Sequence, residues 1–200
     1  MLYPLGWALL AFLCGSLPFS VWLPRLAGGR DARQFGDGNP GATNAFRAGG
    51  AGVGLAVLLL DISKAAAPVG MAYFQFGWRG WPMLLIATAP VLGHAFSPFL
   101  RFRGGKALAP AFGAWIGLTL WQLSLPVLLL VLLWRAALDV DGWAVLLALA
   151  SLLVIILVWQ PELLFLAVLA GQMVILAYTH RAGLRRRPHW RLGRGRPSAG

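Results

Sequence analysis

The chain has 200 residues, of which 59% belong to the hydrophobic set AVILMFWYC and only 12% are charged, against roughly 25% in an average soluble domain. A soluble monomer of this composition would leave large apolar surfaces in water, so composition argues against a soluble fold. The 17 Lys and Arg outnumber the 6 Asp and Glu for a formal net charge of +11. Such an excess favours a phosphate-bearing partner, either nucleic acid or an anionic membrane. The single cysteine, Cys14, excludes an internal disulfide framework and any multi-cysteine metal site.

Long runs without charge predict membrane-spanning helices. The first charged side chain is Arg25, so the first run supplies about the 20 apolar residues needed to cross a 30 Å hydrocarbon core. It lacks the basic leader and small-residue cleavage site of a secretory signal. We therefore expect an all-α, polytopic membrane helix bundle of about seven transmembrane helices, with five or six left open because the division inside 107–138 is indistinct. The predicted spans are 2–23, 53–76, 82–100, 107–121, 123–138, 143–159 and 161–178.

The cations predict the orientation of these spans. With the N-terminus outside, fifteen of the seventeen fall on cytoplasmic loops or on the tail, which leaves Arg79 outside and Lys64 inside a span. We expect one membrane domain over 1–180 and a basic cytoplasmic tail over 181–200, with most of the charge facing the anionic leaflet of the lipid bilayer. Nucleic acid is the alternative partner for the tail, but proline and glycine interrupt it and no recognised nucleic-acid-binding fold surrounds it. We expect no nucleic acid partner.

The first cytoplasmic loop, QFGDGNPGATNAFRAGGAG at 34–52, is rich in glycine and in polar side chains. Glycines let the backbone approach a ligand and turn successive N–H groups toward an anion, so this loop is predicted to bind phosphate. The alternative is a glycine-rich turn in which Thr43 or Asn44 caps the next helix. The candidate phosphate-binding residues are Gly36, Asp37, Gly38, Asn39, Gly41, Thr43, Asn44 and, as a cation, Arg47.

A second loop places a cation beside a glycine pair. Gly104, Gly105 and Lys106 follow the third predicted span. They are not a nucleotide-binding P-loop, which would need glycine at position 100 and Ser or Thr at 107. We predict that Gly104 and Gly105 belong to the phosphate-binding residues and that Lys106 points at a bound phosphate. We assign Arg101 and Arg103 to the ordinary excess of positive charge on cytoplasmic loops.

Two further groups of ionisable residues are expected to support this site. Asp61 and Lys64 lie three residues apart on one helical face inside the second span, where charged groups usually pair with each other. His94 and His180 lie near the inner ends of spans and are expected to form helix-end hydrogen bonds. No His and carboxylate pair has metal-ligand spacing, so neither a metal nor a cofactor is expected.

Four motifs in order resemble one known family. They are GSLPF at 15–19, GDGNPGATNAFR at 36–47, LLDISKA at 59–65 and GHAFSPFLRFRGGKALA at 93–109. Together they resemble the acyl-phosphate-dependent glycerol-3-phosphate acyltransferases of bacterial membranes. The resemblance implies a multi-pass inner-membrane enzyme whose active site faces the cytoplasm, with acyl phosphate and glycerol 3-phosphate as its partners. It would transfer a fatty acyl group to the 1-position of glycerol 3-phosphate and yield lysophosphatidic acid for phospholipid synthesis.

In this interpretation Arg47 and Lys106 are the catalytic cations. No protein nucleophile is needed, because acyl phosphate carries a good leaving group, and a substrate phosphate would take the proton of the attacking hydroxyl. The sequence departs from the family pattern where Asp37 replaces serine, Ala107 replaces glycine and Gly183 replaces asparagine, and the loop RAALDVDG lacks a serine. Two alternatives therefore stay open, namely a weakened or inactive member that binds lipid phosphate and a small membrane transporter. Acyl-chain preference, oligomeric state and the general base are not specified by the sequence.

Overall fold

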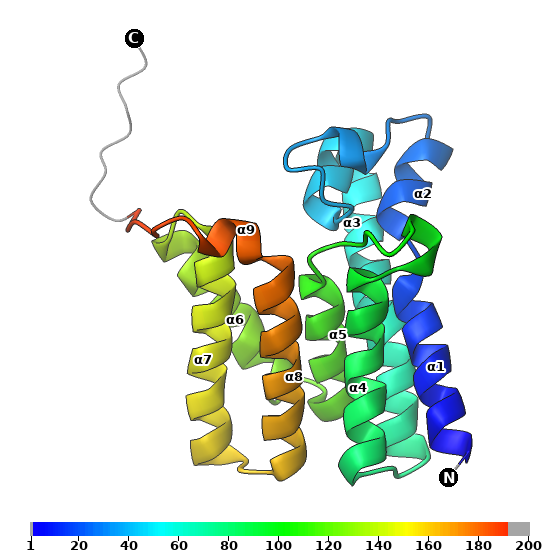
Figure 1. Ribbon diagram of the computed structural model, residues 1–200, viewed down its shortest axis with the longest axis vertical. Helices are drawn as coiled ribbons and strands as arrows, with labels where there is room; N and C mark the ends of the chain where they lie inside the picture. Colours follow the sequence, from blue (N-terminus) through cyan, green and yellow to red (C-terminus); the bar gives the residue numbers. More distant parts are fainter. Residues whose placement is uncertain (1, 192–200) are drawn as a thin grey trace.

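The uncharged runs fold into helices that stand side by side along one axis, so residues 2–191, which the computed structural model describes, form an all-α bundle (Figure 1). Its longer helices in chain order are α1 (Leu2–Ser16), α2 (Phe19–Leu26), α3 (Ala42–Gly70), α4 (Gly80–Ala95), α5 (Leu108–Thr119), α6 (Ser124–Ala137), α7 (Asp141–Trp159) and α8 (Leu163–Thr179). Shorter turns are η1 (Ala32–Gln34), the π-helical η2 (Met71–Gln75), η3 (Pro98–Leu100) and α9 (Arg181–Leu184). Residues 192–200 of the predicted tail lie outside the described part.

Each of the seven predicted spans contains a helix, although their lengths differ. In the described chain, three helices are long and apolar enough to cross a membrane, namely 42–75, 80–100 and Asp141–Trp159. The bent pair α1 and α2 passes as a fourth if it is one span, and α5, α6 and α8 are shorter apolar helices. The predicted all-α helix bundle is confirmed, whereas the count of seven spans and their orientation stay predictions.

The first predicted span is broken where α1 meets α2. The two helices are bent by 41° at Leu17 and Pro18, since proline has no N–H with which to continue the α1 ladder. The carbonyls exposed by this break find other donors: Ser97 Oγ donates to Ser16 O at 2.6 Å and Lys64 Nζ to Leu17 O at 2.8 Å. The buried Lys64 therefore stabilises a break that would otherwise leave a carbonyl unpaired in the bundle.

The second helix begins earlier than the sequence pattern indicates. It was expected from about residue 53, yet α3 starts at Ala42, with Gly41 as its N-cap residue. The helical run is interrupted at Gly50, whose φ of 81° lies in the left-handed region that suits glycine. Neither Thr43 nor Asn44 caps the helix, and the predicted loop of 34–52 is a loop only as far as Gly41. The apolar pattern marked the spanning part of α3 and missed the polar turns before it.

Small residues bring the helices of the bundle close together. A Cβ added to Gly93 of α4 would lie 2.1 Å from the Phe12 carbonyl oxygen of α1, and one added to Gly113 of α5 would lie 2.1 Å from the Ile62 carbonyl oxygen of α3. Such contacts between backbones are typical of helix packing in membranes. On the outer surface, large apolar side chains remain exposed on α1, α6, α7 and α8, as a lipid-facing surface requires.

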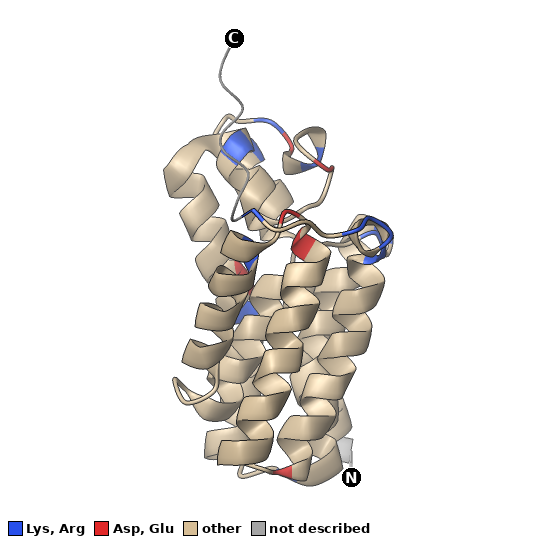
Figure 2. Cartoon of the chain, turned by 90° about the vertical axis from the view of Figure 1, so that its left-hand side faces the viewer, with Lys and Arg blue, Asp and Glu red and all other residues tan. Residues whose placement is uncertain are grey.

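Most charged residues lie at one end of the bundle (Figure 2). The loops before α3, α5 and α7 and the segment after α8 all emerge at this end, which is also where the described chain finishes (Figure 1). The connections at the other end are short, and they include Arg79 and Glu162. The fold therefore brings the glycine-rich loop, the Lys106 loop and His180 to one end, although they lie far apart in the sequence.

Candidate functional site

A polar cleft and an apolar pocket meet at the charged end. The cleft, called the outer cleft below, has a volume of about 1770 Å³, and the inner pocket that runs into the bundle has about 600 Å³. Arginine side chains from the loops and the tail line the outer cleft, whereas leucine, valine, alanine and aromatic side chains line most of the inner pocket. The residues that line both spaces, called the junction below, are Asp37, Asn39, Thr43, Arg47, Lys106, Arg135, Asp141 and His180.

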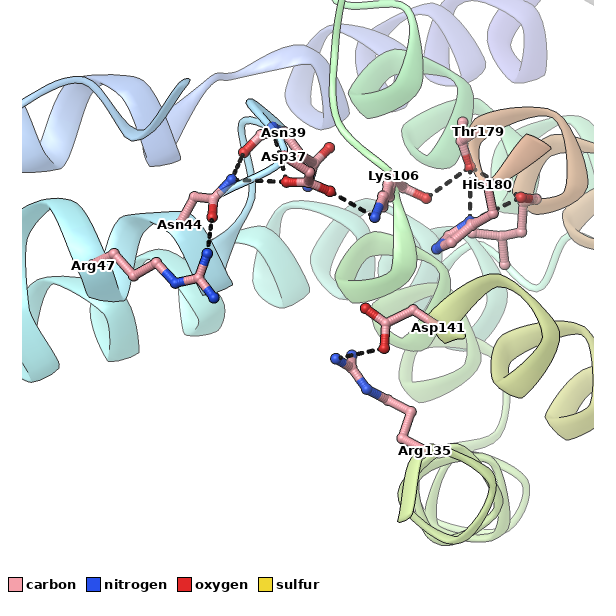
Figure 3. Close-up of polar contacts among 10 residues, drawn as sticks. Asp37, Asn39, Asn44, Arg47, Lys106, Arg135, Asp141, Thr179 and His180 are labelled. Carbon is pink, nitrogen blue, oxygen red and sulfur yellow. Dashed lines mark hydrogen bonds and ion pairs between the residues drawn. The ribbon is translucent and has the colours of Figure 1, made fainter. Parts of the chain in front are cut away.

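The central contact of the junction is an ion pair between Lys106 and Asp37 (Figure 3). Lys106 Nζ lies 2.7 Å from Asp37 Oδ2, and Asp37 Oδ1 accepts hydrogen bonds from Asn44 Nδ2 at 3.0 Å and from the Asn39 amide at 3.2 Å. Partial burial raises the pKa of Asp37, but the hydrogen bond from Lys106 and the two other donors outweigh it and hold that pKa below its ordinary value. Asp37 is therefore ionised, and it forms an ion pair with the lysine that a bound phosphate would need.

Arg47 lies on the first turns of α3 next to Asn44, and the Asp37 side chain lies between it and Lys106 in the view of Figure 3. Its Nη1 lies 3.4 Å from Asn44 Oδ1, and a Cβ on Gly36, whose φ is +56°, would come within 2.2 Å of the same nitrogen. Gly36 thus makes room for the guanidinium. The first turn of a helix also has N–H groups without an intrahelical acceptor, at the positive end of the helix dipole. In α3 the Asn44 and Ala45 amides already donate to the Gly41 carbonyl, so the amides of Ala42 and Thr43 are the candidate backbone donors one turn before Arg47.

The loop before α3 is held by Asp31. This buried carboxylate lies 2.5 Å from Arg25 Nη2 and 2.7 Å from Arg33 Nη2, and it accepts a hydrogen bond from the Arg33 amide. The hydrogen bond from the Arg33 side chain is the main cause that lowers the pKa of Asp31 to about 2. The carboxylate stays ionised above that pH and fixes the path of the chain that delivers Asp37.

The backbone around Lys106 is anchored to α4 and α8. Thr179 Oγ1 donates to the Lys106 carbonyl at 3.1 Å, while the Gly105 and Gly104 amides donate to the carbonyls of His94 and Ala95 at 3.0 and 3.1 Å. A Cβ on Gly105 would lie 2.3 Å from His94 Nε2, so only glycine allows this approach. The amides of Gly104 and Gly105 are therefore already bonded to carbonyls. In the structure, this glycine pair positions Lys106.

His180 and an ion pair complete the junction. His180 Nδ1 lies 2.9 Å from the Leu176 carbonyl, and since a carbonyl only accepts, Nδ1 donates a proton there and Nε2 is left as the acceptor of a neutral ring. Opposite it, Arg135 Nη2 lies 3.1 Å from Asp141 Oδ1 (Figure 3). The junction therefore holds three cations, Arg47, Lys106 and Arg135, and two of them are paired with carboxylates.

A buried group of charged residues lies between α3 and α4. Lys64 Nζ is 2.6 Å from Asp61 Oδ1 and 2.9 Å from His94 Nδ1, and all three side chains are buried. Asp61 and His94 line the inner pocket, whereas Lys64 faces the break after α1. These contacts fit the expected supporting role, because they tie α1, α3 and α4 together directly beneath the Lys106 loop.

Most of the residues predicted from sequence lie together at the cleft and the pocket. Gly36 and Lys64 line neither space and act through Arg47 and the α1 break. Sequence reasoning missed Arg135, Asp141 and Thr179. In the sequence, Arg135 counts only as one of the cations that orient the spans. The signal that could have found Asp141 is its position as an acidic residue in the first turn of α7. Within residues 2–191 no three His, Cys, Asp or Glu side chains gather so as to hold a metal ion.

The family model described as glycerol-3-phosphate acyltransferase matches residues 5–188. A glycerol-3-phosphate acyltransferase of Cronobacter sakazakii is 50% identical over 109 residues, which are 54% of this chain and 53% of the relative. The chain thus spans about half the length of the curated relatives it matches. Two crystal structures of PlsY, described as an integral membrane glycerol 3-phosphate acyltransferase, are similar to this chain. One is the glycerol 3-phosphate form and the other is the lysophosphatidic acid form. Each matches with a TM-score of 0.82 over 92% of this chain and 91% of that chain, at 30% and 29% identity.

Proposed function

The chain belongs to the glycerol-3-phosphate acyltransferase family and is a membrane protein, and from this we propose that it transfers a fatty acyl group from acyl phosphate to the 1-hydroxyl of glycerol 3-phosphate. The product is lysophosphatidic acid, which would enter phospholipid biosynthesis. The observation that carries the proposal is the junction, where an arginine-lined cleft meets a deep apolar pocket. Such a site suits two phosphates and one acyl chain.

The charges of the site match those of the substrates. Two anions have to approach each other for the reaction, and Arg47 and Lys106 would reduce their repulsion while the N-terminal amides of α3 bind phosphate oxygens. The arginines that line the outer cleft raise the local concentration of anionic substrate. The acyl chain would lie in the inner pocket, which excludes water from the carbonyl.

The reaction is balanced without a protein nucleophile. The 1-hydroxyl oxygen of glycerol 3-phosphate attacks the acyl carbonyl carbon, a carbon–oxygen bond forms, and the bond from that carbon to the phosphate oxygen breaks. Inorganic phosphate leaves, and a phosphate oxygen accepts the hydroxyl proton, since its second pKa lies near 6. Arg47 and Lys106 stabilise the developing charge, and the fixed loop anchored by Thr179 holds Lys106 in position. The proposed chemistry uses neither a metal nor a cofactor.

We place residues 1–180 in one inner-membrane domain of seven spans and residues 181–200 in a basic cytoplasmic tail. The cytoplasmic face is proposed for the active site because the cation-rich loops share the end where the junction lies (Figure 2). Contact of these loops with an anionic leaflet would keep the outer cleft at the headgroup level, where acyl phosphate and product can exchange with the bilayer.

The decisive experiment is acyl transfer by purified protein in detergent micelles or proteoliposomes. Palmitoyl phosphate and labelled glycerol 3-phosphate should give labelled lysophosphatidic acid and one inorganic phosphate per product. Lys106→Ala and Arg47→Ala should each abolish turnover, whereas Arg79→Ala, which removes a cation from the opposite end, should leave the rate unchanged. Folded, inserted protein that forms no product would contradict the proposal.

The assay also separates the alternatives. Binding of alkyl phosphate without turnover would identify an inactive family member, for which Asp37 supplies a physical reason because it places an anion against Lys106. The family and the PlsY structures do not favour a transporter. Uptake of glycerol 3-phosphate into proteoliposomes without acyl transfer would support one.

A further inference from the structure

Below the junction, each helix around the inner pocket contributes one stripe of side chains. On α6, α7 and α8 lining residues recur every four positions, which is the spacing that keeps them on one helical face, and Leu128 of α6 lies beside its stripe. The stripes are Val127, Val131 and Arg135 on α6, Asp141, Val145 and Leu149 on α7, and Gln172, Leu176 and His180 on α8. Each stripe is polar at the junction, and those of α6 and α7 end on an apolar residue, whereas that of α8 ends on a buried glutamine.

The three stripes give the same depth for the pocket. In each of them the deepest lining residue is eight positions away from the junction residue. At a rise of about 1.5 Å per residue this corresponds to about 12 Å. An extended chain advances about 3.4 Å for every three bonds, so roughly eleven bonds separate the junction from the pocket floor.

The floor is made by a hydrogen-bonded pair from α5 and α8. Trp115 Nε1 donates to Gln172 Oε1 at 2.8 Å, and Gln172 Nε2 donates to the Ala111 carbonyl at 3.3 Å. Trp115 is 1% exposed and Gln172 is fully buried. Beneath the tryptophan lies Phe165, whose ring centroid is 6.2 Å from that of Trp115 and which does not line the pocket. The pocket therefore ends on the Trp115 ring, with solid core beneath it.

The polar pair makes this floor rigid. A buried amide without partners would be costly, so Gln172 keeps its bonds to Trp115 and Ala111 and holds the indole in one orientation. An apolar side chain at position 172 would leave the Trp115 N–H without its acceptor and the ring free to turn. Neither residue belongs to the motifs found in the sequence, and the proposed reaction does not use either of them chemically.

We infer that Trp115 and Gln172 set the length of acyl chain that the enzyme prefers, by closing the pocket about ten to twelve carbons below the reacting phosphate. This inference rests on the proposed function, since it concerns the chain of the acyl donor. Chains up to that length gain contact with every added methylene. Longer chains have to bend away from the floor or leave the pocket, and they gain little more.

The test measures binding and turnover across a series of chain lengths. Alkyl phosphates of 8 to 18 carbons are titrated onto the detergent-solubilised full chain, and acyl phosphates of the same lengths are assayed for kcat/KM. For the wild type, affinity should rise about fourfold per methylene up to ten to twelve carbons and then level off. In Trp115→Leu the levelling should shift by three or more carbons, so that the 16-carbon to 12-carbon ratio rises at least tenfold.

Two further variants keep the test decisive if Trp115→Leu does not fold. Gln172→Leu should keep its affinity for 10-carbon phosphate within about twofold of wild type and lose the sharp change at ten to twelve carbons. Trp115→Phe with Gln172→Leu removes both partners of the hydrogen bond at once, which should preserve folding and shift the change toward longer chains. The control is Met83→Ala, which creates a cavity in the same core. Met83 lies on α4 and does not line the pocket, so this variant should keep the chain-length profile of the wild type.

The outcomes separate this inference from the proposed function. An unchanged levelling point in the Trp115 and Gln172 variants would overturn the inference, as would an equal shift in Met83→Ala. A wild type that binds alkyl phosphates with the expected length profile but forms no product would leave the inference standing and contradict the proposed activity. Product formation with no dependence on chain length would contradict the inference alone.

Discussion

Asp37→Asn is expected to tighten the binding of glycerol 3-phosphate. Asparagine keeps the size of the side chain and an oxygen that can accept from Asn44, but it removes the charge that lies 2.7 Å from Lys106 Nζ. A phosphate bound to Lys106 would lie within about 4–6 Å of the carboxylate, the range in which a neighbouring charge is felt. Asp37 is 51% exposed and Lys106 34%, so the repulsion is strongly screened.

The magnitude follows from these distances. At 5 Å and an effective dielectric of about 40 to 80, two unit charges repel by about 0.8 to 1.7 kcal/mol. Removing the charge should therefore lower the KM for glycerol 3-phosphate about fourfold to seventeenfold, because 1.4 kcal/mol corresponds to a factor of ten. The gain should shrink as salt is added, since the site is open to solvent.

The assay is the initial rate of lysophosphatidic acid formation against glycerol 3-phosphate concentration, at low and at high ionic strength. Glu162→Gln removes one negative charge from the connection between α7 and α8, which lies at the opposite end of the bundle (Figure 1), and should change nothing. A KM that stays the same or rises in Asp37→Asn would refute the reasoning. A hundredfold loss of kcat would show instead that Asp37 has a role in the chemical step.

Three other changes probe the site and its supports. Gly183→Asn restores the residue that the family resemblance leads one to expect. A Cβ there would lie no closer than 3.6 Å to its neighbours, so the added amide should fit and lower the KM for glycerol 3-phosphate by about fivefold, the worth of about 1 kcal/mol. Asp31→Asn should cost about 2 kcal/mol of stability at pH 7, measured by chemical unfolding in detergent, because the folded-state pKa of about 2 lies below the ordinary 3.8. That stabilisation is present above pH 3.8 and lost as the pH falls through 2, so the wild type and the variant should converge in acid. Lys64→Met should destabilise the protein by about 3–5 kcal/mol, since it leaves Asp61 charged and buried and the Leu17 carbonyl unpaired. Adding Asp61→Asn should recover part of the loss, and an undiminished melting temperature in the single variant would argue against this support.

The helical bundle was predictable because hydrophobic runs report directly on burial in a membrane. The positions at which the helices begin, break and end were harder to predict. The first run has no charge before Arg25, yet its helix breaks at Pro18, and the break is stable only because Lys64 and Ser97, distant in sequence, donate to the freed carbonyls. Long-range compensation of this kind leaves no local signal.

The candidate site was partly predictable for a related reason. Glycine next to Arg47 or Lys106 indicates close approach of backbone and cation, and the structure brings both residues to the junction. The glycine amides were expected to face a phosphate, whereas in the structure the Gly105 amide donates to the His94 carbonyl. Sequence spacing showed that the backbone comes close but could not show which acceptor it meets.

The floor of the pocket could not be predicted from the sequence. Trp115 lies within an apolar run where an aromatic residue is ordinary core, and Gln172 is a single polar residue inside a predicted span. Only the tertiary fold, which places their two helices α5 and α8 within reach of each other, brings them within hydrogen-bonding distance. A side chain that closes a cavity is defined by what surrounds it in space.

The most direct measurement of the central claim is transfer from palmitoyl phosphate to labelled glycerol 3-phosphate by the purified chain, with product and inorganic phosphate counted in the same reaction. We predict equal amounts of labelled lysophosphatidic acid and phosphate for the wild type and neither for Lys106→Ala. Phosphate released without lysophosphatidic acid, or lysophosphatidic acid formed equally well by Lys106→Ala, would contradict the assignment of acyl transfer to the junction.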